Sequence, residues 1–397
     1  MERIVGEKWM RSWPFLLRGM QRMVSSELRS CRAEDVSTIL SQHYRIGPIS
    51  AIREVRGGII NRTWRADTET GVFSIQIMPP TNSSGPQARW MEKYRVLQSV
   101  GIRVPRLVCT NCGENSAPLA GKLRCRVSTW LAGAHPTPPL DITKVEKLFE
   151  FFARFHTAIN LTEPDGWRVA DLQSTPHIME WLATDFAHAA TEGDGAKIAS
   201  EILRFWRIEK DELTDETPVI QGHGDLQLSN VIMDSHLGLA TGLIDLDTMG
   251  FMTMADELGD AFRAALMSYD RPNLTRPQYR MDQTEQFILA GITGYRQGLG
   301  AGDFRQRVET YLNYPVLLSA MRRIIFNLAA RYCLAIRGRV PFRTDRTNQE
   351  DRVEEFTKLA RITWEMFLRI WENRSQTTLS LRRDKEYRDP DANREQR

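Results

Sequence analysis

The chain has 397 residues, which is enough for two domains or for one large two-lobed unit. Its 42% hydrophobic and 26% charged composition is typical of a soluble globular protein. The net charge of +3, with both signs interspersed, argues against nucleic acid as the main partner, and no apolar run is long enough to cross a bilayer.

The cysteines and the N-terminal segment bear on location. The five cysteines are scattered and odd in number, which indicates free thiols in a reducing compartment, so we expect a cytoplasmic protein. Cys109 and Cys112 form a CxxC, but a zinc site would need a second close pair of ligands. The apolar stretch 13–17 is too short for the core of a signal peptide. Oligomeric state stays open.

The first part of the chain predicts a small antiparallel sheet with one helix. Residues 1–35 form an N-terminal extension with no assigned chemistry. Residues 46–78 alternate in the manner of strands and are broken by Gly57-Gly58 and by the TETG turn. Helical spacing with a glycine stop follows at 88–101, and two more strand-like segments lie at 105–109 and 122–131. We therefore expect a β-rich lobe over residues 36–130.

The rest of the chain is mostly helical. A proline-rich connection at 133–141 precedes a strongly amphipathic pattern at 143–159. Helical patterns recur at 176–190, 196–209, 256–269, 282–298, 303–336 and 350–373. The charged tail, 376–397, lacks an apolar face and is expected to be disordered. The prediction is an α+β, bilobal protein with a larger, mostly helical lobe over residues 131–375.

Two motifs interrupt the helices, GHGDLQLSNVIMD at 222–234 and GLIDLDTMG at 242–250. The DSHLG turn between two short strands predicts a hairpin that brings Asp245 beside Asn230 and Asp225. Three oxygen-bearing side chains at one point suit a hard cation, and Mg²⁺ fits when phosphates supply other ligands. The alternative is a loop rich in turn formers, in which the Asp and Asn side chains only cap the backbone.

The H-x-D-x-x-x-x-N spacing has a mechanical interpretation. Asp225 reaches an incoming hydroxyl, Asn230 lies one loop away on the metal, and Asp245 bridges the metal and the nucleotide phosphates. Two such motifs in this order, behind a β lobe with a glycine turn, favour kinase chemistry over simple capping.

With these motifs the sequence resembles the aminoglycoside phosphotransferase and choline kinase superfamily, whose signature is HGDxxxxN followed by IDxD. It is most similar to the N-acetylhexosamine 1-kinase group. The resemblance covers roughly residues 35–375. It is carried by the two motifs and by GGIINRTW, FSIQIM, WMEKYRVL, RVSTWLAGA and ADELGDAFR. It implies a protein-kinase-like fold and transfer from ATP to an alcohol group.

The resemblance also implies roles for individual residues. Asp225 would be the catalytic base and His223 would orient its loop. The metal site would comprise Asn230, Asp245 and Asp247. The nucleotide would contact Gly57, Gly58 and Asn61 over its phosphates, and the backbone of Ser128, Thr129, Trp130 and Leu131 at adenine. Thr248 and Arg323 would face the substrate, and Asp256 and Asp260 would anchor a helix start to the loop.

One position departs from the protein-kinase pattern. Gln76, in FSIQIM, stands where protein kinases carry the lysine that binds the α and β phosphates, and Glu92 is its expected helix partner. Glutamine brings no positive charge. Lys93 and Arg65 are two candidates to supply it.

The sequence therefore predicts a Mg²⁺-dependent small-molecule kinase with ATP as co-substrate. The expected acceptor is a hydroxyl of a sugar or amino sugar, with the anomeric hydroxyl as one alternative. An aminoglycoside-type antibiotic phosphotransferase and a non-catalytic, kinase-like nucleotide-binding protein are the other functions left open. The choice between ATP and GTP also stays open.

Overall fold

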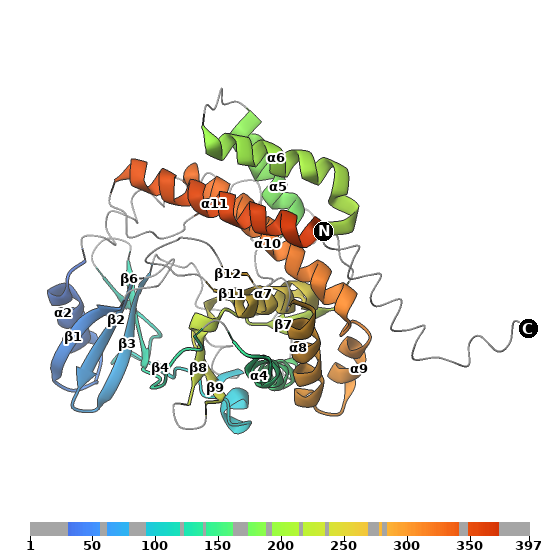
Figure 1. The fold of residues 1–397 in the computed structure, drawn as a ribbon. Coiled ribbons are helices and arrows are strands. Elements are labelled where there is room, and N and C mark those ends of the chain that lie inside the picture. Colours follow the sequence, from blue (N-terminus) through green and yellow to red (C-terminus); the bar gives the residue numbers. More distant parts are fainter. Residues whose placement is uncertain are drawn as a thin grey trace, which may run out of the picture. The chain divides into compact units, whose positions relative to one another are not determined.

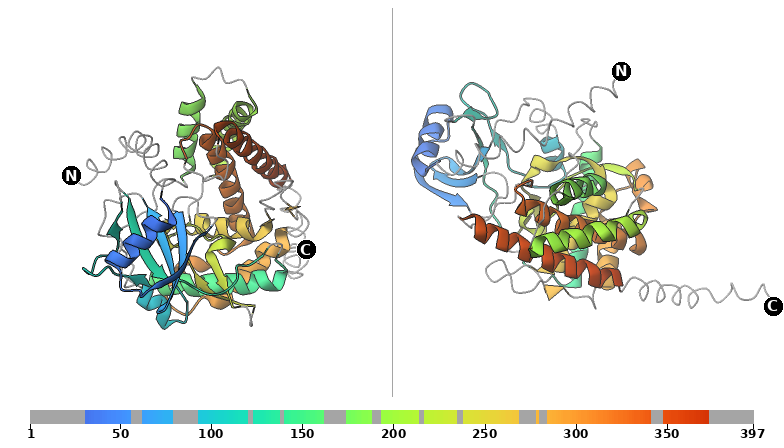
Figure 2. Two further views of the ribbon diagram at one scale, coloured as in Figure 1. Left: turned by 90° about the vertical axis from the view of Figure 1, so that its left-hand side faces the viewer. Right: turned by 90° about the horizontal axis from the view of Figure 1, so that it is seen from above.

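The computed structural model describes residues 31–55, 62–78, 93–119, 123–137, 140–161, 174–187, 193–213, 217–234, 238–268, 278–279, 284–340 and 348–372. They fall into two compact units (Figures 1 and 2). The N-terminal unit comprises Met1–Ala134, Thr241–Ile244 and Leu334–Phe356. The C-terminal unit comprises His135–Ala240, Asp245–Cys333 and Thr357–Arg397.

The N-terminal unit contains the expected antiparallel sheet. Its 6 strands run in the order β1-β2-β3-β6-β4, with β5 also paired to β6. Their bounds are β1 Ile49–Val55, β2 Arg62–Thr68, β3 Gly71–Met78, β4 Leu107–Val108, β5 Ala117–Pro118 and β6 Arg124–Thr129. Residues 93–99 are helical, as predicted, and residues 100 and 101 form a turn. Residues 88–92 of that predicted helix lie outside the described residues.

One face of this sheet packs on helix α2, Ala33–His43. Alternate residues of the central strands, Ile75 and Ile77 on β3 and Val127 on β6, are fully buried in this core. The hydroxyl of Tyr44 donates to the carbonyl of Cys125 at 2.7 Å and ties the end of α2 to β6. No helix was expected here, although AEDVSTILSQH has apolar residues at helical spacing.

The C-terminal unit is largely helical. Its helices are α4 Ile142–Asn160, α5 Thr175–Ala187, α6 Asp194–Glu209, α7 Met254–Leu266, α8 Thr284–Gly298, α9 Asp303–Glu309, α10 Tyr314–Ile336 and α11 Gln349–Glu372, of which the last two extend into the other unit. The predicted helix at 303–336 is two helices, because Asn313 accepts the backbone N–H of Val316 (3.1 Å) and Pro315 suits only the first turn of a helix. None of the described helices is long and apolar enough to cross a membrane.

Helices α4 and α8 approach each other at backbone distance. A Cβ on Gly294 would lie 1.9 Å from the carbonyl oxygen of Glu146, and one on Gly298 would lie 2.1 Å from that of Glu150. Only glycine fits at these positions. The close approach is what places residues of α8 against residues of α4 in the interior of this unit.

Short strands frame the two motifs. The predicted hairpin is present as β8, Val231–Met233, paired with β9, Ala240–Leu243. A second pair, β7 Val219–Gly222 with β10 Gly250–Thr253, was not expected from the sequence. The remaining pair is β11 Met267–Ser268 with β12 Gln278–Tyr279. The α+β class is thus confirmed.

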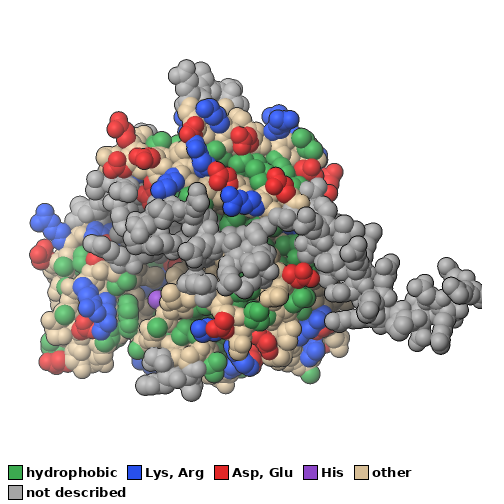
Figure 3. Space-filling model, in the orientation of Figure 1, with side chains coloured by type: hydrophobic (Ala, Val, Ile, Leu, Met, Phe, Trp, Pro, Cys, Tyr) green, Lys and Arg blue, Asp and Glu red, His purple; other side chains and the backbone are tan. Residues whose placement is uncertain are grey.

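Basic and acidic side chains lie interspersed on the face drawn in Figure 3, in keeping with the small net charge. All five cysteines are free thiols, and Cys109 and Cys112 are exposed.

Candidate active site

Asp225 and Asn230 lie together on the loop between β7 and β8, residues 222–230, which we call the HGD loop. The side-chain amide of Asn230 donates to the backbone carbonyl of Asp225 and to its carboxylate oxygen Oδ2, both at 2.9 Å. Gln227 donates to the same Oδ2 at 2.7 Å. Two amides therefore orient one carboxylate. Sequence reasoning missed Gln227, although it lies inside the motif.

The surroundings of Asp225 make its carboxylate more basic than usual. Burial raises the pKa of Asp225, and the negative charge of Asp260 raises it further, against the opposing effects of His223, Gln227 and Arg263. A carboxylate with a raised pKa accepts a proton from an alcohol more readily than an ordinary aspartate does.

The residues predicted to hold a metal offer oxygen atoms of the right kind. Because the amide nitrogen of Asn230 is bound to Asp225, its Oδ1 points away from that carboxylate. Asp245 follows β9 in the left-handed region, with φ +59°, and its side chain is exposed; it is the only non-glycine residue with positive φ among those described. Asp247 is half-buried in the short 3-10 turn Leu246–Thr248. Carboxylate and amide oxygens suit Mg²⁺. The described part of the chain holds no cluster of three His, Cys, Asp or Glu arranged for a metal.

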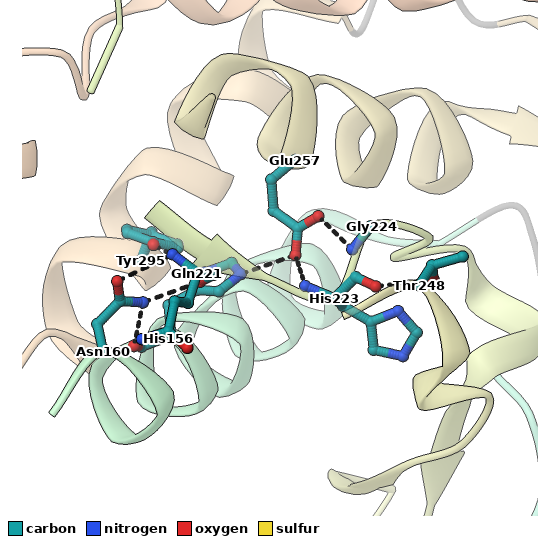
Figure 4. Close-up of polar contacts among 8 residues, drawn as sticks. All are labelled: His156, Asn160, Gln221, His223, Gly224, Thr248, Glu257 and Tyr295. Carbon is teal, nitrogen blue, oxygen red and sulfur yellow. Dashed lines mark hydrogen bonds and ion pairs between the residues drawn. The ribbon is translucent and has the colours of Figure 1, made fainter. Parts of the chain in front are cut away.

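Glu257, on α7, holds the backbone of the HGD loop (Figure 4). Its Oε1 accepts the backbone N–H of His223 at 2.6 Å, and its Oε2 accepts that of Gly224 at 2.9 Å. From the other side the hydroxyl of Thr248 donates to the carbonyl of His223 at 2.8 Å. The loop before Asp225 is therefore fixed by hydrogen bonds at consecutive backbone groups.

Glycines on either side of His223 permit these approaches. A Cβ on Gly222 would lie 2.8 Å from the carboxyl carbon of Glu257. One on Gly224 would lie 2.5 Å from the carbonyl oxygen of Thr248, and the φ of Gly224 is +80°. The two glycines of GHGD are thus required by packing.

A buried chain of polar residues supports Glu257 (Figure 4). Nε2 of His156, on α4, lies 2.9 Å from Oε1 of Glu257, and Nδ1 lies 2.8 Å from the hydroxyl of Tyr295 on α8. Burial alone would raise the pKa of Glu257, but the hydrogen bond and charge of His156, together with His223, hold that pKa below its usual value. Burial raises the pKa of Tyr295, which stays protonated. Glu257 is therefore an ionised anchor.

The assignment of the anchor to Asp256 and Asp260 was wrong in detail. Asp256 accepts from the hydroxyl of Thr253 at 2.7 Å and from the guanidinium of Arg323 at 2.9 Å. Asp260 forms an ion pair with Arg263 at 2.7 Å. The residue between them, Glu257, reaches the loop. Helix-capping preferences favour aspartate at a helix start, and no local signal distinguishes the glutamate.

Two residues were expected to face the substrate, and both form hydrogen bonds with other groups of the protein. Thr248 binds His223, and the buried Arg323 binds Asp256. Arg331, on α10, is a cation that sequence reasoning did not single out. Burial lowers the pKa of Arg331, while the carboxylates of Asp260 and Asp225 oppose that shift. The positive charge of Arg331 therefore interacts electrostatically with Asp225, the candidate base.

The N-terminal unit holds the residues expected to bind nucleotide. Gln76 is half-buried on β3. The segment Ser128–Leu131 ends β6 and follows it, and there the N–H of Trp130 donates to Val72 at 2.9 Å and that of Thr129 to Arg106 at 2.8 Å. Four expected residues lie outside the described residues: Gly57, Gly58, Asn61 and Glu92.

The two candidates for a compensating charge are Arg65 and Lys93. Arg65 is ion-paired with Asp67 at 2.7 Å, and its guanidinium lies over the ring of Trp130, 5.3 Å from the centroid. Lys93 is buried at the start of the described helical segment 93–99.

Several solved structures share this fold. Choline kinase from Cryptosporidium parvum Iowa II has a TM-score of 0.59 at 13% identity, over 88% of this chain and 98% of that chain. The amicoumacin kinase hAmiN, in complex with AMP-PNP, has a TM-score of 0.54 at 15% identity, over 86% of this chain and 96% of that chain. A microcompartment-associated aminopropanol kinase has a TM-score of 0.53 at 15% identity, over 86% of this chain and 98% of that chain. The expected protein-kinase-like fold is confirmed.

The sequence itself gives the family. No curated protein matches the chain significantly. Residues 51–301 match the model of the phosphotransferase enzyme family, a span that includes all but the first two residues of the sheet, the HGD loop, Asp245 and Glu257. The prediction of an ATP-dependent phosphotransferase with a hydroxyl acceptor is confirmed at this level: the chain belongs to the phosphotransferase enzyme family.

Proposed function

We propose that the protein transfers the γ-phosphoryl group of ATP to a hydroxyl of a sugar or amino sugar, in the manner of the N-acetylhexosamine 1-kinase group. The observation that carries the proposal is the carboxylate of Asp225, whose pKa is raised and whose orientation is fixed by Gln227 and Asn230. A base of this kind suits an alcohol, which does not ionise by itself at neutral pH.

In the proposed reaction the acceptor oxygen forms a bond to the γ-phosphorus as the bond to the ADP oxygen breaks. Asp225 accepts the proton of the acceptor hydroxyl, and Gln227 and Asn230 hold the carboxylate in place for it. Oδ1 of Asn230 and the carboxylate of Asp245, backed by Asp247, would hold Mg²⁺, which neutralises phosphate charge. His223 contributes through its backbone, which Glu257 and Thr248 fix.

Adenine is proposed to bind the backbone that follows β6. The N–H groups of Thr129 and Trp130 already donate to carbonyls of the same unit, so Leu131 is the donor proposed for the base. Gly57, Gly58 and Asn61 are proposed to cover the phosphates, with Glu92 near Gln76.

The charges around Asp225 support a neutral acceptor more than a polycationic antibiotic. An acceptor with several ammonium groups needs carboxylates in excess. Among the described residues, Asp260 is paired with Arg263, Asp256 is paired with Arg323, and Arg331 adds a further cation. Thr248 and Arg323 would then shape the acceptor site through His223 and Asp256.

An acceptor screen tests the proposal. Purified protein with Mg·ATP is offered N-acetylhexosamines and other sugars, amino alcohols and aminoglycosides, and phosphorus NMR identifies the hydroxyl that is phosphorylated. We expect a sugar phosphate whose formation is lost in Asp225→Asn. Turnover of an aminoglycoside but of no sugar would replace the proposed acceptor. No turnover with any acceptor, and no effect of Asp225→Asn, would favour the non-catalytic alternative.

A further inference from the structure

The sheet of the N-terminal unit has one apolar and one polar face. Successive side chains of a strand point to opposite faces, and Ile75, Ile77 and Val127 point to the core that α2 covers. Gln76 and Arg126 occupy the alternate positions of β3 and β6. They therefore lie on the other face.

Gln76 and Arg126 are direct cross-strand partners. The register pairs Gln76 with Arg126 on one side and with Thr63 of β2 on the other. Nε of Arg126 donates to Oε1 of Gln76 at 3.0 Å, and its Nη2 donates to the same oxygen. Because Oε1 faces the guanidinium, the amide NH₂ of Gln76 is directed away from it as a further donor.

Arg126 is also buried, with 7% of its surface exposed. A guanidinium is charged at all physiological pH values, and its planar fork of N–H groups matches phosphate oxygens. Arg65, by comparison, is held by Asp67 and Trp130. The sheet therefore places a permanent cation beside the position where a lysine was expected.

We propose that Arg126 is the cation that binds the α and β phosphates of the nucleotide, with Gln76 as its positioning residue. The inference rests on the proposed function, since it presumes that the polar face of the sheet receives ATP. In this chain the positive charge is supplied from the neighbouring strand, and the glutamine orients it and adds an N–H donor to the same phosphates.

A ladder of ligands without any acceptor tests the assignment. The affinities of adenosine, AMP, ADP and Mg·ATP are measured by calorimetry for wild type and for Arg126→Gln. We expect ADP and Mg·ATP to bind about 10- to 100-fold more weakly to the variant, as for loss of a charged hydrogen bond. Adenosine affinity should change by less than about twofold, because adenosine has no phosphate for Arg126 to bind.

Exchange of the two side chains gives a sharper test. The double variant Gln76→Lys/Arg126→Gln returns one cation to the pair, on the other strand, and should recover ADP affinity to within about fivefold of wild type. The control is Arg124→Gln, on the same strand and face, where the arginine binds Glu114 and Ser116. It should leave all four affinities unchanged.

Each remaining outcome has a definite meaning. Arg126→Gln that binds ADP as wild type does, or that loses adenosine as strongly as ADP, contradicts the role of Arg126 and leaves the proposed function standing. If ADP affinity recovers in Arg126→Lys but not in the double variant, a cation at position 76 does not replace one at position 126, which contradicts the expected exchange. A wild-type protein that binds no nucleotide contradicts the proposed function, and the inference with it.

Discussion

The buried carboxylate of Asp225 suits a catalytic base but lowers the stability of the folded protein. Its pKa is raised by burial and by Asp260, so the folded protein holds the ionised form less favourably than the unfolded chain does. The amides of Gln227 and Asn230 offset part of this penalty. Such a conflict is common at functional sites, and it gives the residue a signature beyond loss of activity.

Asp225→Asn should greatly slow turnover and stabilise the fold. Loss of the base lowers kcat by about 10²–10⁴-fold, while Mg·ATP affinity should stay within about twofold. Since the folded pKa is raised, ionisation of Asp225 reduces stability at neutral pH, and removal of the charge should raise Tm by about 2 °C. Scanning calorimetry at pH 7 measures the change. A lower Tm together with lost ATP affinity would instead indicate a structural role.

The pH profile reports the same carboxylate. Asp225 acts as base only when ionised, so kcat/KM should rise with pH through its pKa, above the value of about 3.9 for a free aspartate. Asp260→Asn removes a negative charge that raises this pKa, and the acid limb should move to lower pH. Asp303→Asn, at the start of α9, is the control and should leave the limb in place. An unmoved limb in Asp260→Asn would contradict this coupling.

At the scale of elements, α4, α7 and α8 together fix a loop that none of them contains. Glu257, His156 and Tyr295 come from three helices, and each is almost wholly buried. Periodicity predicts that these helices exist and which face is apolar. It does not reveal which buried polar residue of one helix meets which residue of another, because those contacts join residues about a hundred positions apart along the chain.

Glu257→Gln should lower stability in a pH-dependent way. The folded pKa of Glu257 is depressed, so its contribution is full above about pH 4.3 and is lost as pH falls through the folded pKa. At pH 7 the variant leaves a backbone N–H facing an amide NH₂, which costs about 1–3 kcal/mol. The difference in Tm between variant and wild type should therefore shrink in acid. A difference that is constant with pH would show that the charge is unimportant.

The packing of α4 on α8 should be intolerant of a methyl group. In Gly294→Ala the new Cβ meets the carbonyl oxygen of Glu146, so the helices must separate, with an expected loss of about 1–3 kcal/mol or more. Gly300→Ala is the matched control, because its Cβ would lie 3.6 Å from the side chain of Thr157, an ordinary contact. Urea unfolding compares the two. Equal free energies of unfolding would contradict the close approach.

For the whole molecule, most of the strands and helices could be predicted in order, whereas contacts distant in sequence could not. The hairpin before Asp245 was found because turn and strand signals are local. Helix α2 was missed because its short pattern lies across the boundary at residue 35 between the expected extension and the expected β-rich lobe. Arg126 was missed because its relation to Gln76 exists only in the register of β3 on β6.

Ligand binding should stabilise the whole chain. A nucleotide that binds only the folded state adds about 2.7 kcal/mol at a hundredfold excess over Kd. We expect Mg·ATP to raise Tm more than ATP with a chelator does. Asp245→Ala should abolish that difference, since Asp245 is proposed to hold the metal. The rise in Tm that ATP causes in the presence of a chelator should remain. A full magnesium effect in the variant would remove Asp245 from the metal site.

The glycines beside His223 separate two kinds of failure in a library of single substitutions. Any side chain at Gly222 or Gly224 collides with Glu257 or Thr248, so those variants should be depleted from a screen that records only how much folded protein accumulates in cells. Asn at position 225 should pass that screen and fail only a screen in which growth requires the enzyme to make its product. Within the tetrapeptide GHGD, substitutions of the two glycines should therefore lower abundance, whereas substitution of Asp225 should lower activity alone. The abundance screen can be carried out without knowing the acceptor.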